Sequence, residues 1–201
     1  MTLEIKRKRG WRLWAGVLAV LFTVAATVVT HHALGEKNDE NAAPPVSVEQ
    51  ARAWVAAGEN LTRISKPVWK ELLDKKAYYI LWDNGTERAF SGDLLHEKRE
   101  GVFVSKGCRL PVFSSDHKFK SGTGWPSFWD VFDKDNVVLK EDRSWGMRRI
   151  EVRSRCGEHL GHVFEDGPAP TGLRYCINAE ALAFIPAGTN DPFGPFSSPD
   201  E

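Results

Sequence analysis

Apolar residues form one uninterrupted run near the start of the chain, at residues 13–29. This run (LWAGVLAVLFTVAATVV) holds seventeen residues without a charge, which is the short end of what crosses a bilayer as a helix. Five Lys and Arg residues precede it within residues 1–12, and such clusters stay cytoplasmic. We expect residues 1–33 to be a basic segment followed by an uncleaved transmembrane anchor. A cleaved signal peptide is the alternative, although no small-x-small cleavage site lies beside the run.

The segments that follow have polar and then helical patterns. Residues 34–58 begin as a polar, Pro-containing stretch, which predicts a linker. Within this linker, residues 48–57 have helical spacing and are followed by a glycine. Residues 65–76 predict a second helix, with Ser65 as its cap, Pro67 in its first turn and two Lys in its last. The first part of the domain is therefore expected to be partly helical.

From residue 85 onward the chain consists of short apolar segments separated by Gly and Pro. The clearest segment, 149–153, alternates polar and apolar residues as a strand does. Further strand candidates are 102–104, 112–113 and 176–185. This pattern predicts a mainly β fold, with antiparallel sheets or a small β-barrel and short N-terminal helices. We place the domain at residues 59–186 and expect the Pro-, Gly- and Ser-rich residues 187–201 to be disordered.

Composition narrows the possible functions. Lys+Arg and Asp+Glu both number 27, so no overall basic field is present to attract nucleic acid. Eight Trp and eleven Phe are enough for a substantial core and for the wall of a pocket. Three cysteines are too few and too unevenly spaced for a disulfide framework, and an odd count leaves at least one thiol to react.

One of these cysteines lies in the segment GLRYCIN, which has the alternation of a strand. Tyr175 and Ile177 are expected to face the core. Arg174, Cys176 and Asn178 then share the other face. A cationic neighbour favours the thiolate, which is the reactive form of cysteine. The alternative is a small buried cysteine, with Arg174 in a surface salt bridge.

Two further motifs contain candidate functional residues. In SGTGWPSF (121–128), glycines and a proline constrain the backbone around Trp125, which forms either the wall of a small apolar site or part of the core. In HLGHVF, His159 and His162 would face opposite sides of a regular strand, but a bulge at Gly161 would bring them together. Histidine is the usual proton donor near neutral pH. A metal pair or a single core histidine are the alternatives.

Cys108 and Cys156, considered with the two histidines, raise the question of zinc. Structural zinc sites usually contain Cys-x2-4-Cys pairs. Here Ser105 stands three residues before Cys108, and Arg153 stands three residues before Cys156. Neither pair exists, so we expect no bound metal.

Four segments, in this order, together resemble the methionine sulfoxide reductase B family. They are GTERAFSG (85–92), FSSDHKFKSGTGWPSFWD (113–130), EVRSRCGEHLGHVFEDGP (151–168) and TGLRYCINAEALAFIP (171–186). The resemblance implies a mostly antiparallel β fold. It also implies reduction of the R epimer of methionine sulfoxide, chiefly in oxidised proteins, to methionine by a thiol, with no metal or organic cofactor.

The resemblance also implies roles for individual residues. Cys176 would attack the sulfoxide sulfur and become a sulfenic acid. His162, with His159 beside it, would protonate the leaving oxygen, and Arg174 would favour the thiolate. The remaining positions would orient waters and imidazoles (Asn178 and Asp166) or receive the methyl end of the substrate (Trp125 and Phe164).

Two features of many family members are missing from this sequence. Zinc-binding members have two Cys-x-x-Cys pairs, of which only Cys108 and Cys156 remain. Many members also have a resolving cysteine at the position of Thr123. Cys108 or Cys156 could form the disulfide with Cys176 instead, and Cys108 is favoured because a loop near it could move. An external thiol that reduces the sulfenic acid directly is the third possibility.

The anchor and the resemblance together predict a cellular setting. Residues 13–29 would hold the protein in a bacterial inner membrane, with a periplasmic catalytic domain that repairs oxidative damage in the cell envelope. A cleaved signal peptide would leave a soluble periplasmic enzyme. Because this compartment oxidises thiols, we expect a membrane-linked thioredoxin-like domain to supply electrons.

Two other functional classes are compatible with parts of the sequence. A non-catalytic module of the same fold could bind a methionine-containing peptide at Trp125. The presence of all the implied catalytic residues argues against this module. A Cys/His zinc protein is distinguished by its metal content.

Overall fold

The computed structural model describes residues 44–59 and 61–189. The apolar run at 13–29, residues 34–43 of the linker and the tail beyond residue 189 lie outside the described residues. Within the described part of the chain, no helix is both long enough and apolar enough to cross a membrane.

The first helix, α1 (Val48–Ala57), has the boundaries that its pattern predicts. The Ser47 side chain accepts a hydrogen bond from the Gln50 backbone N–H at 3.1 Å, which caps the helix start. Gly58, at φ 70°, ends it in the left-handed conformation. Ala51 and Val55 lie on one helix face and are buried in the hydrophobic core. This helix therefore packs into the same hydrophobic core as the elements that follow it.

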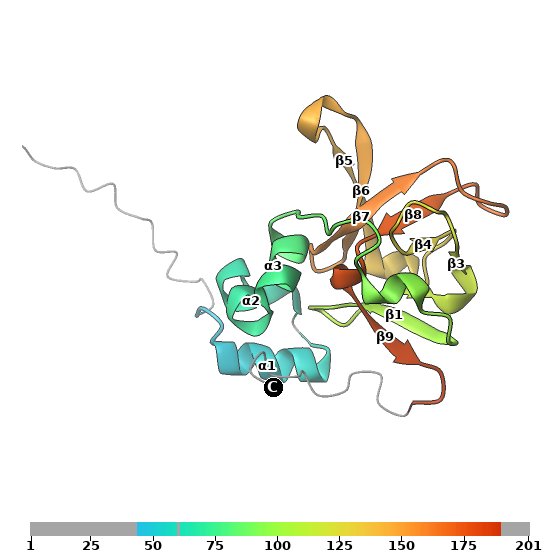
Figure 1. The fold of residues 1–201 in the computed structure, drawn as a ribbon. Helices are drawn as coiled ribbons and strands as arrows, with labels where there is room; N and C mark the ends of the chain where they lie inside the picture. The colour runs from blue at the N-terminus through green and yellow to red at the C-terminus, as the bar shows by residue number, and fades with distance from the viewer. Residues whose placement is uncertain (1–43, 60, 190–201) are drawn as a thin grey trace, which may run out of the picture. The chain divides into compact units, whose positions relative to one another are not determined.

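The single helix expected at 65–76 is two helices, α2 (Lys66–Leu72) and α3 (Lys75–Trp82). Leu73 is extended and breaks the helix. Asp74 starts α3, because its carboxylate accepts hydrogen bonds from the backbone N–H groups of Lys76 and Ala77 at 2.9 and 2.8 Å. Ser65 occupies the cap position of α2, as expected, but its side chain makes no capping hydrogen bond. Figure 1 shows α1, α2 and α3 gathered beside the sheets.

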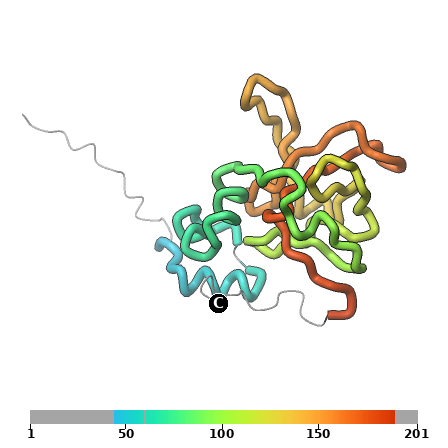
Figure 2. The backbone as a smooth tube through the Cα atoms, viewed as in Figure 1, coloured from blue at the N-terminus to red at the C-terminus, as the bar shows by residue number. Residues whose placement is uncertain are grey.

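The described strands form two antiparallel sheets, with the orders β2-β1-β9 and β3-β4-β8-β7-β6-β5. The strands are β1 (Gly101–Ser105), β2 (Pro111–Ser114), β3 (Lys118–Phe119), β4 (Ser127–Phe128), β5 (Val137–Asp142), β6 (Arg149–Ser154), β7 (His159–Phe164), β8 (Arg174–Ile177) and β9 (Leu182–Pro186). Short 3-10 turns connect several of them. The prediction of a mainly β, antiparallel fold with short helices is confirmed. In Figure 2 the β5–β6 hairpin extends beyond the neighbouring strands.

The strand predicted at 176–185 divides between the two sheets. β8 ends at Ile177, and a 3-10 turn (Ala179–Ala181) follows, in which the Ala181 N–H donates to the Asn178 carbonyl at 3.1 Å. β9 then pairs with β1 in the other sheet. The prediction of one long strand was wrong because this turn changes the chain direction without a Gly or Pro.

An aromatic cluster fills the space between the sheets. Phe113 of β2 stacks on Phe128 of β4, with ring centroids 4.4 Å apart. Phe113 also contacts Tyr175 of β8, and Phe103 of β1 meets Phe128 edge-on at 5.0 Å. Tyr175 and Ile177 are buried, as predicted. Because side chains alternate along a strand, Cys176 lies on the opposite face of β8.

Candidate active site

Cys176 lies on a central strand of the six-stranded sheet and is a free thiol. Its cross-strand partners are Ser127 on β4 and His162 on β7. Residues directly opposite each other in an antiparallel pair have side chains on the same face. The register therefore places the imidazole of His162 and the thiol of Cys176 on one side of the sheet.

The predicted bulge between the two histidines is present. Val152 pairs with Gly161 but Arg153 pairs with His159, which leaves Leu160 as an extra residue in β7. Because of this extra residue, the side chains on the two sides of the bulge no longer alternate in register, and His159 and His162 point to the same face of the sheet. The rings of His159 and His162 consequently meet edge to face, with centroids 5.5 Å apart.

Glycine is required at position 161 for a second reason. A Cβ atom there would overlap the carbonyl oxygen of Cys176. The two strands that carry the thiol and the imidazoles can therefore approach each other closely at this point.

His162 is held by a carboxylate that the sequence did not indicate. Its Nε2 lies 2.8 Å from Oδ2 of Asp142, and the Arg149 guanidinium contacts the same oxygen at 2.7 Å. Hydrogen bonds from the Ser144 hydroxyl and backbone N–H, together with His162, hold the pKa of Asp142 far below its usual range. Asp142 is therefore an anion at neutral pH. It is twenty residues from His162 in the sequence and belongs to the β5–β6 hairpin.

His159 is more deeply buried than His162. Its Nδ1 lies 2.7 Å from Oε1 of Glu151. Burial lowers the pKa of His159, although Glu151 acts in the opposite direction. A buried neutral imidazole in contact with His162 fits a supporting role better than proton donation.

Burial raises the pKa of the Cys176 thiol. The Thr123 hydroxyl, 3.8 Å from the sulfur, and the Arg174 guanidinium lower this pKa but do not offset burial. Arg174 therefore lowers the pKa of the Cys176 thiol, as expected, but its effect is smaller than that of burial. The thiolate fraction is smaller than for an ordinary cysteine at neutral pH and rises with increasing pH.

Asp166 contacts Arg174 rather than either imidazole. Its carboxylate accepts hydrogen bonds from Nε and Nη2 of Arg174 at 2.8 and 2.9 Å. The guanidinium also lies over the ring of Phe164, at 4.5 Å from the centroid. The family resemblance implied that Asp166 orients waters and imidazoles. In the structure Asp166 instead positions Arg174 beside the Cys176 thiol.

Asn178 joins two segments behind the site. Its Oδ1 accepts from the Glu87 backbone N–H, and its Nδ2 donates to the Leu160 carbonyl, both at 3.1 Å. Glu87 also provides the carbonyl that accepts from the Trp125 indole N–H, at 3.3 Å. Asn178 and the 85–92 segment therefore hold the bulge and the tryptophan in place.

These side chains surround a cavity of about 140 Å³. It is lined by Thr86, Trp125, Arg149, Gly161, His162, Phe164, Cys176 and Asn178. Five of these were candidates from the sequence: Trp125, His162, Phe164, Cys176 and Asn178. The sequence analysis did not identify Thr86 or Arg149 as site residues. It also did not identify Asp142, which pairs with Arg149 and His162. A thiol and an imidazole between two aromatic walls suit a small substrate that has one apolar end and one proton-accepting oxygen.

Comparison with known proteins identifies the family. Residues 73–186 match the SelR domain. Over 121 residues the chain is 59% identical to a protein named peptide methionine sulfoxide reductase MsrB from Methanosarcina barkeri, covering 60% of this chain and 85% of the relative. It is 54% identical over 127 residues to a Methanosarcina mazei protein of the same name, covering 63% and 91%. The chain belongs to the methionine sulfoxide reductase B family.

A vertebrate protein is also similar to this chain. The mouse protein named methionine-R-sulfoxide reductase B3, mitochondrial, is 46% identical over 118 residues, which is 58% of this chain and 47% of that protein. The chain is thus an oxidoreductase of a family whose members include proteins of Methanosarcina and of mouse.

The zinc-binding members of the family prompt a test of the corresponding residues here. Cys108 and Cys156 form a disulfide with each other, and their Cα atoms are 6.6 Å apart. Their sulfurs and a Glu158 carboxylate oxygen all lie within 4.8 Å of one another. Disulfide sulfurs, however, are not the thiolates that bind metal. Cys108 is joined to Cys156 rather than to Cys176, the partner that the resolving role requires.

The remaining groups also do not fit zinc. Burial raises the pKa of Glu158 toward the uncharged acid, and its oxygens already accept from the Ser154 hydroxyl at 2.6 Å and the Cys108 backbone N–H at 2.9 Å. Arg153, where zinc-binding members have a cysteine, is a cation paired with Glu151 at 2.9 Å. This donor set does not provide the four tetrahedral ligands of a structural zinc site.

Proposed function

We propose that this chain reduces protein-bound methionine R-sulfoxide to methionine, with Cys176 as the nucleophile. The observation that carries the proposal is the free thiol of Cys176 directly across the strand pair from His162, in a cavity walled by Trp125 and Phe164. Family membership supports the same reaction. The aromatic walls suit the methyl end of the side chain, and the imidazole suits its oxygen.

In the proposed first step, the Cys176 thiolate attacks the sulfoxide sulfur. This attack forms a bond between the two sulfurs. The protonated oxygen then moves from the methionine sulfur to the cysteine sulfur, and the original sulfur–oxygen bond and the sulfur–sulfur bond both break, which leaves a sulfenic acid at Cys176. Methionine leaves as a thioether, reduced by two electrons, and the cysteine is oxidised by two electrons. The Arg174 guanidinium, held by Asp166, favours the attacking anion, and the opposing effect of the Asp166 charge on the Cys176 pKa is smaller.

The sulfoxide oxygen needs a proton before it can leave, and we assign its donation to His162. The Asp142 carboxylate, 2.8 Å from Nε2 of His162, holds the imidazole in its orientation in the cavity. The Cys176 thiol loses one proton when it becomes a thiolate, and the sulfoxide oxygen gains one, which it keeps in the sulfenic acid. The reaction therefore neither consumes nor releases a net proton. The chemistry requires no metal or organic cofactor.

We propose that an external thiol then reduces the sulfenic acid directly. The support is the disulfide between Cys108 and Cys156, which occupies both candidate resolving residues. The external thiol condenses with the sulfenic acid, releasing water and forming a mixed disulfide. A second thiol restores Cys176.

The reaction is tested by the two epimers of a peptide methionine sulfoxide, each incubated with the full chain and dithiothreitol. Turnover of the R epimer alone is expected, and the S epimer is an internal control for nonspecific reduction. If the folded protein reduces neither epimer, the proposal fails, and the non-catalytic binding module becomes the better interpretation.

Thr123→Cys is expected to create a resolving cysteine. Because the Thr123 hydroxyl lies 3.8 Å from the Cys176 sulfur, a thiol at this position would meet the sulfenic acid as an intramolecular partner. One equivalent of R-sulfoxide, without reductant, should link the two thiols. Dimedone trapping of the Cys176 sulfenic acid should fall by about tenfold or more.

Thr123→Ser is the matched control, because it keeps a hydroxyl and adds no thiol. It should leave the sulfenic acid as reactive toward dimedone as in the unmodified chain. Peptide mapping that finds Cys176 linked to Cys108 or Cys156 in the unmodified chain would contradict direct reduction by an external thiol.

We also propose that residues 13–29 anchor the enzyme in a bacterial inner membrane, with the domain in the periplasm and a thioredoxin-like donor. The support is the charge-free run behind a basic cluster. Membrane fractionation with intact mass of the product separates the alternatives. A soluble product that lacks the first residues would indicate a cleaved signal peptide.

A further inference from the structure

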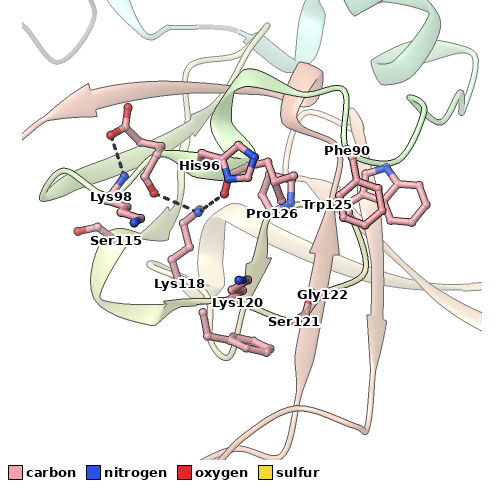
Figure 3. Close-up of a pocket in the computed structure, with 14 residues that line it drawn as sticks. Phe90, His96, Lys98, Ser115, Lys118, Lys120, Ser121, Gly122, Trp125 and Pro126 are labelled. Carbon is pink, nitrogen blue, oxygen red and sulfur yellow. Dashed lines mark hydrogen bonds between the residues drawn. The ribbon is translucent and has the colours of Figure 1, made fainter.

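A second cavity, of about 440 Å³, lies beside the first and shares Trp125 with it. It is lined by Phe90, Leu95, His96, Glu97, Lys98, Ser115, Lys118, Phe119, Lys120, Ser121, Gly122, Gly124, Trp125 and Pro126. Figure 3 shows Phe90 and Trp125 together at one side and Lys98 and Ser115 at the other, with Lys118 and Lys120 between them. The proposed reaction uses only Trp125 of this set.

The turn at residues 121–124 separates the two cavities. Its Thr123 hydroxyl contacts the Cys176 sulfur at 3.8 Å, whereas Ser121, Gly122 and Gly124 line the larger cavity. Neighbouring residues of a polypeptide are about 3.8 Å apart along the chain. A protein whose oxidised methionine enters the small cavity must therefore place its adjacent residues against the surface around it, and the larger cavity adjoins it through Trp125.

Phe90 is held in an unusual conformation at the edge of the larger cavity. It has φ 64°, and the residue is 69% exposed. Its backbone N–H donates to the Gly124 carbonyl at 2.8 Å, which ties it to the separating turn. A bulky residue in this backbone region is strained, and such strain is concentrated at functional sites. Here it maintains an exposed aromatic ring beside Trp125 (Figure 3).

The charges around the larger cavity are predominantly positive. Lys98, Lys118 and Lys120 contribute three cations to the lining, against one carboxylate, Glu97. That carboxylate is ionised, but its negative charge is already paired with a cation. Arg99 contacts it through Nε at 3.0 Å and holds the pKa of Glu97 at about 2.

Lys118 is fixed in place and is partly removed from water. Its ammonium donates to the carbonyls of Leu95 and Glu97 at 2.9 and 3.1 Å. Burial lowers the pKa of Lys118 and the nearby Lys98 acts in the same direction, whereas Glu97 acts in the opposite direction. A carboxylate bound beside Lys118 and Lys98 would offset the repulsion between the two ammonium groups, which favours an anionic ligand.

We propose that the larger cavity holds the residues that flank methionine sulfoxide in a protein substrate and selects an acidic side chain there. This inference rests on the proposed function, because it assigns the flanking segment of the same substrate. The aromatic side receives the backbone and apolar groups of the segment, and the lysines pair with its carboxylate. Charge complementarity and continuity with the Cys176 cavity identify this occupant.

The test compares kcat/KM for four R-sulfoxide substrates on the full chain. Three are peptides that differ only in having Glu, Gln or Lys next to the oxidised methionine, and the fourth is the capped amino acid N-acetyl-methionine sulfoxide amide. The Glu peptide should exceed the Lys peptide by about tenfold at low salt. The difference should shrink in about 0.5 M salt because exposed charges are screened.

Lys98→Glu combined with Lys120→Glu should reverse the order of the Glu and Lys peptides. Both lysines are exposed and lie outside the proposed reaction. Lys70→Glu, on the exposed face of α2 and outside both cavities, is the control for net charge. It should preserve the original order. The capped amino acid should be reduced equally by all variants.

The outcomes separate the two proposals. If the unmodified chain does not reduce the capped amino acid or any of the peptides, the proposed function itself fails. If it reduces the capped amino acid but treats the Glu and Lys peptides alike, the inference about the larger cavity is overturned. It is also overturned if Lys70→Glu shifts the order as much as the double variant does.

Discussion

Cys176→Ser is expected to abolish reduction of methionine R-sulfoxide, by a factor on the order of 10⁴ or more. A serine hydroxyl does not ionise near neutral pH and cannot accept the sulfoxide oxygen as a sulfenic acid. The variant should fold normally, because serine is slightly smaller than cysteine and Ser127 already occupies the neighbouring cross-strand position. The measurement is methionine released from the peptide over time, together with a thermal unfolding curve.

Adding Ser65→Cys to Cys176→Ser provides the control for a thiol elsewhere. Ser65 is exposed and its side chain makes no capping hydrogen bond, so the new thiol is accessible but lies outside the cavity. This double variant should remain inactive. Substantial turnover by a well-folded Cys176→Ser protein would show that another group carries out the reaction.

The alternation around Cys176 was sufficient to predict which side chains face the core. Tyr175 and Ile177 are buried as expected, since a period of two assigns alternate residues to opposite faces. The bulge in β7 was also predictable, because only an irregularity at a glycine could bring His159 and His162 together. Local patterns therefore located the cysteine and the histidines.

The groups that tune these residues were not predictable from local patterns. Asp142 reaches His162 through the pairing of three successive strands, and its register depends on the fold as a whole. The turn after Ile177 was missed because it contains no Gly or Pro. The net effect on the Cys176 pKa depends on burial, which outweighs Arg174 and is a property of packing rather than of spacing.

The pairing of Cys108 with Cys156 was also not predictable from local sequence patterns. Cys108 lies in the connection between β1 and β2, and Cys156 lies in the connection between β6 and β7. The sequence pointed to them as residues left at zinc-ligand positions or as partners for Cys176. Only the arrangement of the two sheets places them against each other, 48 residues apart in the chain.

Replacing Cys108 and Cys156 together by alanine is expected to lower the free energy of unfolding by about 4 kcal/mol in non-reducing buffer. Closing a loop of 48 residues removes about this much conformational freedom from the unfolded chain. Alanine at both positions avoids a lone thiol and leaves no polar group at Cys108, which is 1% exposed. Urea unfolding of the two proteins measures the difference.

The same comparison in dithiothreitol shows whether the disulfide is responsible. Reduction should destabilise the unmodified chain but not the double alanine variant, so that their unfolding curves approach each other. The disulfide links a connection in one sheet to a connection in the other, and Cys176 takes no part in it. Under conditions in which both proteins are folded, their rates of R-sulfoxide reduction with dithiothreitol should therefore be similar. Equal stability in non-reducing buffer would contradict this role.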